Sequence, residues 1–117
     1  GFKSAQEAFV RILNMANKTN HETIEQNLFQ TPSEKQLYTN LVDVKNDLIA
    51  LTNQYDAEKT LEKLETLAEP IHQFFEHNLV MDPNEAIKLN RLALVNQTAK
   101  IISDFANLTL IEWRQHQ

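Results

Sequence analysis

Three polar side chains near the start of the chain have the types and spacing that RNA recognition uses. Arg11, Asn14 and Lys18 follow one another at intervals of three and four residues, so they share one stripe if the segment is helical. Two positive charges and an amide on an exposed stripe could contact RNA phosphates and base edges. The spacing is equally typical of a polar helix surface that only faces water, so both interpretations stay open.

A second group of candidate RNA-binding residues is Lys88, Asn90 and Arg91. Helical geometry places Arg91 inside an apolar arc and Asn90 at its edge, whereas Lys88 lies towards the polar side. A charged side chain within an apolar arc more often pairs with an acid across a helical bundle than meets a ligand. We therefore favour a structural role for Arg91 slightly over RNA binding, and we interpret Lys88 as an ordinary surface lysine unless RNA binds there.

One pair of residues has the spacing of a metal site. Glu69 and His72 form a Glu-x-x-His motif, which di-iron carboxylate bundles use in two copies with two further glutamates. The chain has one copy, and Pro70 interrupts it, so we predict no metal site. Because Gly1 is the only glycine, there is no glycine-rich phosphate loop, and no histidine has the partners of a nucleophilic triad. We expect neither a catalytic residue nor a cofactor in this chain.

The composition predicts one all-α domain over residues 1–117. A length of 117 residues suffices for one hydrophobic core, and a content of one Gly and three Pro disfavours the many turns of a β-sheet. No apolar run approaches the ~20 residues of a membrane span. The absence of Cys fits a reducing compartment, so we expect a cytoplasmic protein, and the start without Met suggests an excised domain.

Charge is distributed unevenly along the chain, whose net charge is −5. Residues 1–20 carry a net +2, residues 21–82 a net −8 and residues 83–117 a net +1. If the first and last helices are neighbours, their cations could form one positive face that binds RNA despite the overall negative charge.

Helix caps and apolar periodicity predict the first half of the chain as two helices. The first covers residues 4–17, and a polar connector over residues 18–30 follows it. The second begins with the capping box Thr31-Pro-Ser-Glu34 and runs to about residue 54. Its apolar seam is widened by Tyr38, Val42 and Ile49. Tyr38, Tyr55 and Trp113 are the aromatic side chains free enough to stack on a base.

In the second half of the chain, the same caps and apolar periodicity predict a kinked helix and a central helix. The third helix spans about residues 57–76 and should kink or restart near Pro70. The fourth covers about residues 83–106, takes Asp82 as its cap and has an apolar arc of about half its circumference. A short helical tail follows. Because so wide an arc touches several neighbours, this helix should be the centre of a bundle of about four main helices.

Three stretches together resemble a known family: Leu28-Phe-Gln-Thr-Pro-Ser-Glu-Lys-Gln-Leu-Tyr38, Leu67-Ala-Glu-Pro-Ile-His-Gln-Phe-Phe75 and Asn90-Arg-Leu-Ala-Leu-Val95. Their order and spacing are similar to those of the C-terminal DALR-type anticodon-binding domain of the bacterial glycyl-tRNA synthetase β subunit. Val10-Arg-Ile-Leu-Asn14 also resembles the opening helix of that family, which carries an Arg and an Asn at these two places.

The resemblance implies an all-helical, non-catalytic domain, the C-terminal fragment of a larger chain, that docks on the anticodon end of tRNA. Residue by residue, it implies RNA contacts at Arg11, Asn14, Asn90 and Arg91. In the family the parent enzyme is a glycine–tRNA ligase, an α2β2 tetramer whose α subunit uses ATP and Mg²⁺. The implied partners are therefore tRNA, the α subunit and a second β subunit, with neither DNA nor a membrane. Two alternatives are a helical protein-interaction module that uses its acidic middle segment and a metal-carboxylate bundle enzyme.

Overall fold

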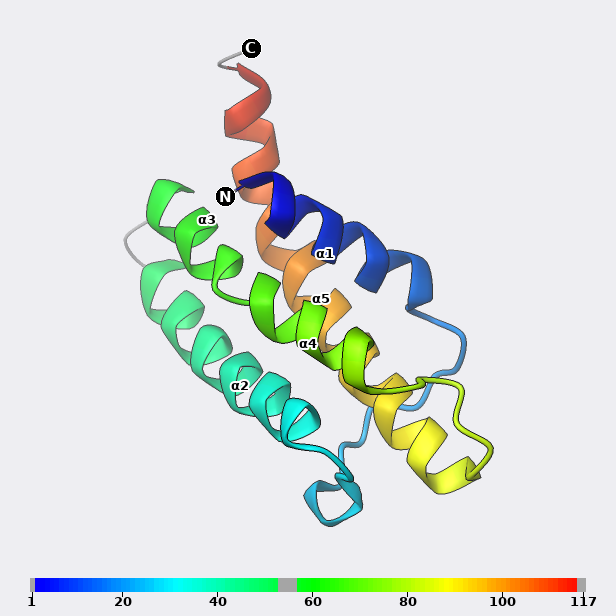
Figure 1. The fold of residues 1–117 in the computed structure, drawn as a ribbon. Helices are drawn as coiled ribbons and strands as arrows, with labels where there is room; N and C mark the ends of the chain where they lie inside the picture. Colours follow the sequence, from blue (N-terminus) through cyan, green and yellow to red (C-terminus); the bar gives the residue numbers. More distant parts are fainter. Residues whose placement is uncertain (1, 53–56, 116–117) are drawn as a thin grey trace.

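Five α-helices and one 3₁₀ turn make up the part of the chain that the structure describes. The computed structural model describes the backbone of residues 2–52 and 57–115 and the side chains of residues 3–50 and 58–104. Its elements, in chain order, are α1 (Phe2–Met15), η1 (Gln26–Leu28), α2 (Pro32–Thr52), α3 (Ala57–Glu65), α4 (Ala68–His77) and α5 (Glu85–Gln115). They form an all-α bundle (Figure 1), which confirms the predicted fold class. Within the described residues, each helix is too short or too polar to cross a lipid bilayer.

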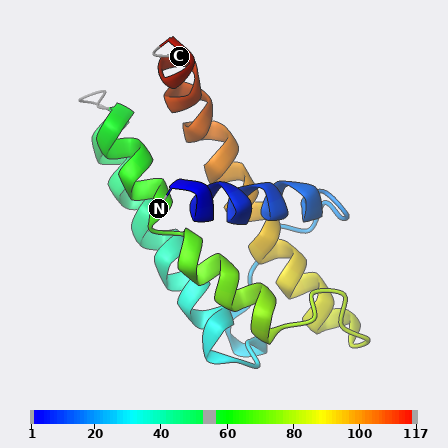
Figure 2. The same ribbon diagram turned by 45° about the horizontal axis from the view of Figure 1, so that its top comes forward.

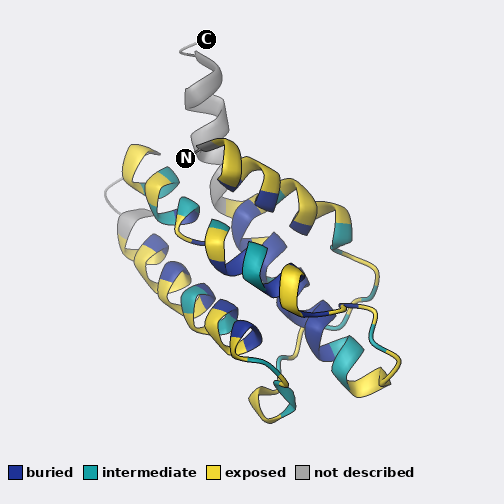
Figure 3. Cartoon of the chain, in the orientation of Figure 1, coloured by how far each residue is buried: buried dark blue, intermediate teal, exposed yellow. Residues whose placement is uncertain are grey.

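α5 is the central helix of the bundle. It packs against α1, α2, α3 and η1, and every residue from 90 to 96 is buried. Figure 3 shows this buried segment in the middle of the molecule. Because burial around a whole circumference needs neighbours on several sides, it confirms the wide apolar arc that the sequence predicts. The helical tail expected after residue 106 is continuous with α5.

α1 lies across α5 and beside α4 (Figure 2). Its inner stripe of Ala5, Ala8 and Ile12 is buried, and small side chains there allow the helices to approach closely. The first and last helices are therefore neighbours, which is the arrangement that a shared positive face would need. Helical spacing predicts Leu13 on the same face as Ala5 and Ile12, but Leu13 is 44 % exposed, so that prediction is wrong.

α2 begins with the capping box that the sequence predicts. Thr31 Oγ1 accepts the backbone N–H of Glu34 at 3.4 Å, and Glu34 Oε1 accepts the backbone N–H of Thr31 at 3.0 Å. This reciprocal pair satisfies two donors that a helix start leaves without partners. Phe29 precedes the box and meets Tyr38 with 5.8 Å between ring centroids, so the aromatic side chains fix the chain's entry into α2.

The predicted third helix is divided into α3 and α4 by Thr66 and Leu67. The backbone N–H of Thr66 donates to Lys63 O at 3.2 Å, and that of Leu67 donates to Leu64 O at 3.0 Å, which tightens the end of α3. Pro70 is the third residue of α4, where its missing N–H would have no partner within the helix anyway. The predicted break near Pro70 is confirmed, and it lies just before the proline.

α5 begins two residues later than predicted, and its cap is Asn84 rather than Asp82. Asn84 Oδ1 accepts the backbone N–H groups of Ala86 at 3.0 Å and Ile87 at 3.3 Å, which are the contacts of an N-cap. Asp82 Oδ1 instead accepts the N–H of Asn84 at 2.8 Å. The prediction of Asp82 as the cap is wrong because Asp and Asn are equally good caps, and they stand two residues apart here.

The expectation that Val42 and Ile49 widen the apolar seam of α2 is also wrong. Val42 is 39 % and Ile49 56 % exposed, whereas Tyr38 is half-buried. The stripe that α2 turns towards its neighbours consists of the buried residues Leu37, Leu41, Val44 and Leu48. Val42 and Ile49 lie on the adjoining stripe, and Ile49 lines a hollow of about 350 Å³ together with Lys100 and Ile101 of α5.

Candidate functional site

Arg11 and Asn14 project from α1, and both side chains are exposed. Arg11 Cζ lies over the ring of Phe75, 4.2 Å from its centroid, which makes a cation–π contact between α1 and α4. Glu7 stands one helical turn before Arg11, yet no ion pair joins Arg11 to a residue that the structure describes. An aromatic ring therefore holds the Arg11 guanidinium, and its charge stays available to a ligand.

A hollow of about 480 Å³ lies along this surface of α1. The described residues that line it are Lys3, Gln6, Glu7, Val10, Arg11 and Asn14. Two cations outweigh one acid here, although the whole chain is acidic. Lys18 is exposed too, but α1 ends at Met15 instead of residue 17 and Asn17 has a positive φ of 66°, so the prediction that Lys18 continues the helical stripe of Arg11 and Asn14 is wrong. The cations of the first twenty residues are thus gathered on α1 and just beyond its end.

Arg91, in contrast, is buried among oxygen acceptors. Its Nε lies 3.2 Å from Glu34 Oε2, while its Nη1 donates to Leu79 O at 2.8 Å and to Asp82 Oδ2 at 3.4 Å. Arg91 is 5 % exposed and Glu34 is 0 % exposed. These bonds tie α5 to the start of α2 and to the connector between α4 and α5. They favour the structural role that the apolar arc suggested.

Asn90 is buried as well, and its amide pairs with the backbone of Glu25. Its Oδ1 accepts the N–H of Glu25 at 2.7 Å, and its Nδ2 donates to the carbonyl of Glu25 at 3.0 Å. The side chain thereby replaces the backbone partner that this extended connector residue lacks. RNA contact by Asn90 and Arg91 stays a prediction, and the hydrogen bonds of both residues favour the structural alternative.

Two further amides of α5, which sequence patterns do not single out, hold the same connector. Asn96 Oδ1 accepts the N–H of Asn17 at 2.9 Å, and its Nδ2 donates to the carbonyls of Thr19 at 3.0 Å and His21 at 2.9 Å. Gln97 donates to the next carbonyl along the connector. The sequence does carry a signal for Asn96, which is an amide within the apolar arc of the central helix. Because a buried polar group needs hydrogen-bond partners, such an amide indicates a contact with another segment.

The predicted site residues therefore fall into two groups. α1 and α5 are neighbours, but Asn90 and Arg91 face inward and do not join the exposed surface of Arg11 and Asn14. Lys88 is half-buried, and its Nζ lies 2.9 Å from Glu85 Oε2 on the preceding turn. The exposed group consists of Arg11, Asn14 and Lys18.

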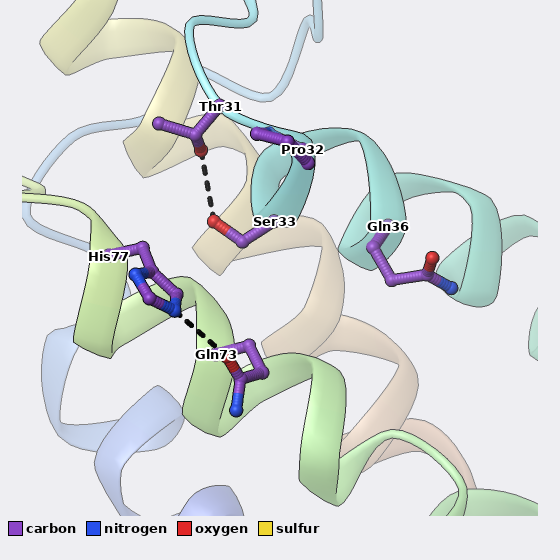
Figure 4. Close-up of a pocket in the computed structure, with 6 residues that line it drawn as sticks. All are labelled: Thr31, Pro32, Ser33, Gln36, Gln73 and His77. Atoms are coloured by element: carbon purple, nitrogen blue, oxygen red, sulfur yellow. Dashed lines mark hydrogen bonds between the residues drawn. The ribbon is translucent and has the colours of Figure 1, made fainter.

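A second hollow, of about 510 Å³, lies between the start of α2 and the end of α4 (Figure 4). The described residues that line it are Thr31, Pro32, Ser33, Gln36, Gln73 and His77. Its polar groups bond to one another: Thr31 Oγ1 lies 2.9 Å from Ser33 Oγ, and His77 Nε2 lies 2.9 Å from Gln73 Oε1. No Lys or Arg is among these described lining residues, so the attraction for phosphate is stronger at α1.

Glu69 and His72 take part in separate hydrogen bonds. His72 Nε2 lies 3.2 Å from both Ser4 Oγ and Ser4 O, whereas Glu69 Oε1 accepts Gln73 Nε2 at 2.8 Å. Across the described residues, no three His, Cys, Asp or Glu side chains are placed to hold a metal ion. Of the aromatic candidates for stacking, Tyr38 is half-buried, and the side chains of Tyr55 and Trp113 lie outside the described residues.

Comparison with known proteins places this geometry in context. The family model of the DALR anticodon binding domain matches residues 5–115. Over 115 residues, the chain is 41% identical to the glycine–tRNA ligase β subunit of Oceanobacillus iheyensis, a match that covers 97% of this chain and 17% of that protein. For the same subunit of Bacillus subtilis the identity is 33% over 111 residues, or 95% of this chain and 16% of the relative. The chain thus spans about a sixth of the length of these relatives.

Proposed function

Because the chain belongs to the DALR anticodon binding domain family, we propose that it binds the anticodon region of a tRNA. The names of its relatives support a finer proposal, in which the tRNA is tRNA(Gly) and the larger protein is the β subunit of a glycine–tRNA ligase. In that proposal the domain forms no covalent bond itself. ATP and Mg²⁺ are used elsewhere in a cytoplasmic α2β2 enzyme, whose α subunit and second β subunit are the protein partners.

The observation that supports RNA binding most directly is the difference between Arg11 and Arg91. Arg91 is enclosed by Glu34, Asp82 and a backbone carbonyl. Arg11 is exposed and rests on Phe75, and the exposed amide of Asn14 is close to it on the next turn. A cation and an amide side by side can bind a phosphate or a base of a single-stranded loop.

The charge of the chain is consistent with this role. A net charge of −5 keeps non-specific affinity for RNA low, because phosphate attraction supplies most of that affinity. Lys3, Arg11 and Lys18 nevertheless place positive charge on and beyond α1. We therefore expect the isolated domain to bind an anticodon stem-loop weakly, with an affinity that falls as salt is added.

The test is the affinity of the chain for the anticodon stem-loop of tRNA(Gly), together with aminoacylation by the full-length protein. The double variant Arg11→Ala/Lys18→Ala loses two charged contacts, each of which contributes about 1.5 kcal/mol or more when charge-assisted. We expect its affinity for the stem-loop to fall by at least about 10-fold, and the KM for tRNA to rise in the full-length protein.

A matched control removes the same charge elsewhere. Lys35 and Lys45 are exposed on α2, and Lys35→Ala/Lys45→Ala should leave the affinity within about 2-fold, since surface charges far from the RNA act only at long range. Equal losses in both double variants would mean that net charge, and not the α1 surface, determines binding. No loss in Arg11→Ala/Lys18→Ala would contradict the proposed site.

A second function is favoured by one observation on α2. Val42 and Ile49 are exposed and stand two turns apart, so they share a stripe, and the exposed Asp43 lies beside them. Exposed apolar side chains with charged neighbours such as Asp43 and Lys45 can contribute to a surface that binds another protein. In this alternative, Asp43→Lys changes the affinity for a protein partner and leaves the affinity for the stem-loop unchanged.

A further inference from the structure

The contact between Arg11 and Phe75 can leave one face of a flat cation free. Arg11 Cζ lies over the ring of Phe75, 4.2 Å from its centroid, a distance at which a guanidinium can lie flat against an aromatic ring. Phe75 is itself fixed, because it is 7 % exposed and meets Phe74 edge-on at 5.4 Å between centroids. Since Arg11 is exposed, a guanidinium that lies flat on the ring has its opposite face open to solvent.

We propose that this outward face of Arg11 is a stacking platform for one unpaired base of the anticodon loop, and that Phe75 is the positioning residue that holds it. The inference rests on the tRNA binding proposed above and specifies how the α1 surface reads RNA. Guanidinium planes stack on splayed bases. An arginine already ordered by an aromatic ring loses less conformational freedom when the base arrives.

The residues within one turn of Arg11 suit a base better than a phosphate. Val10, Asn14 and Glu7 line the hollow of about 480 Å³ beside it, whereas the hollow's other cation, Lys3, lies two turns away on α1. Val10 is 51 % exposed and offers apolar surface to a ring. Asn14 follows Arg11 by three residues, which places the two side chains side by side, so its amide can pair with a base edge. The carboxylate of Glu7 would repel a phosphate but can accept a hydrogen bond from a base.

The test combines Arg11→Lys with RNA that lacks one base. Arg11→Lys keeps the positive charge and removes the plane, and an abasic nucleotide keeps the phosphate and removes the stacking partner. Abasic nucleotides are placed at each position of the anticodon stem-loop in turn. At the stacking position, the unaltered chain should lose about 5- to 100-fold in affinity. Arg11→Lys should lose a similar factor on the intact loop, and the abasic substitution should then have little further effect.

Phe75 is tested by two variants that separate its ring from its burial. Phe75→Leu keeps an apolar side chain but removes the support of Arg11, so it should bind like Arg11→Lys. Phe75→Tyr keeps the ring and should bind like the unaltered chain. Circular dichroism checks that both variants are folded, and if Phe75→Leu does not fold, Phe75→Met takes its place as the variant that keeps apolar volume without a ring.

Three results would overturn the proposal. Normal affinity of Arg11→Lys together with weak binding by Arg11→Ala would make Arg11 a phosphate contact, and tRNA binding itself would stand. Equal losses at the abasic position in the unaltered chain and in Arg11→Lys would mean that the base and Arg11 act independently. If the unaltered chain and the full-length protein both fail to bind the stem-loop at low salt, the proposed function fails, and the platform fails with it.

Discussion

The carboxylate of Glu34 joins Arg91 in α5 to the first turn of α2. Its Oε1 accepts the backbone N–H groups of Gln30 at 2.7 Å and Thr31 at 3.0 Å, and its Oε2 accepts Arg91 Nε at 3.2 Å. One side chain therefore caps a helix and neutralises a buried cation. A helix cap that depends on local sequence is thereby linked to an ion pair that depends on the fold.

Loss of Arg91 should destabilise the protein. Arg91→Ala leaves Glu34 buried without its partner, and breaking one side of a buried ion pair typically costs about 3–5 kcal/mol. Urea unfolding of the chain, followed by circular dichroism, measures this loss. Arg11→Ala is the matched control, because it removes an exposed arginine whose cation–π contact contributes only about 0.5–1 kcal/mol.

The same pair of variants decides the role of Arg91. If Arg91→Ala unfolds at the urea concentration of the unaltered chain and yet binds the anticodon stem-loop poorly, then Arg91 contacts RNA and the structural assignment is wrong. Arg91→Lys adds a second measurement. A lysine keeps the charge but lacks the planar fork that reaches Glu34 and Leu79 O together, so we expect an intermediate loss of stability.

Loss of the Asn96 amide should release the connector that follows α1. Asn96→Ala removes the acceptor of the Asn17 N–H, so hydrogen exchange at Asn17 should become faster. Asn96→Asp keeps the acceptor oxygen and loses both donated bonds, and the Asn17 amide should therefore stay protected. The Glu25 amide, which Asn90 holds, is the internal control and should exchange at the same rate in both variants. Fast exchange at Asn17 in the unaltered chain would contradict the observed bond.

The parts of the fold that depend on neighbours in sequence could be predicted. The capping box at Thr31 needs residues three apart, and the break before Pro70 follows from a missing N–H. The central position of α5 follows from its wide apolar arc. Local sequence does not decide between two good N-caps that stand close together. Asp82 is therefore predicted as the cap of α5, whereas Asn84 provides it.

The sequence predicts only those features of the candidate site that lie within one helix. The stripe of Arg11 and Asn14 follows from helical spacing, and both side chains are exposed as expected. The support of Arg11 by Phe75 depends on how α1 packs against α4, which spacing along one helix does not reveal. The partners of Asn90 are backbone atoms of a connector 65 residues away. A hydrogen-bonding side chain within an apolar arc signals that a partner exists, but it does not identify that partner.

Replacement of the Asn84 cap should cost about 1 kcal/mol of stability. Asn84→Ala leaves the N–H groups of Ala86 and Ile87 without their acceptor, whereas Asn84→Asp keeps an oxygen and adds a charge that favours a helix start. Urea unfolding should therefore show a loss for Asn84→Ala and little change for Asn84→Asp. If Asn84→Ala is as stable as the unaltered chain, Asn84 is not the residue that caps α5.

The orientation of α2 can be tested with two adjacent residues. Leu48 is 0 % and Ile49 is 56 % exposed, so Leu48→Ala should cost about 2–5 kcal/mol, and Ile49→Ala should stay within about 0.5 kcal/mol. Similar costs in the isolated chain would mean that α2 is rotated relative to this structure. The comparison then extends to the full-length protein. If Ile49→Ala destabilises only the full-length protein, the exposed stripe of α2 is covered there by another part of the larger protein, and this surface is then not available to a separate protein partner.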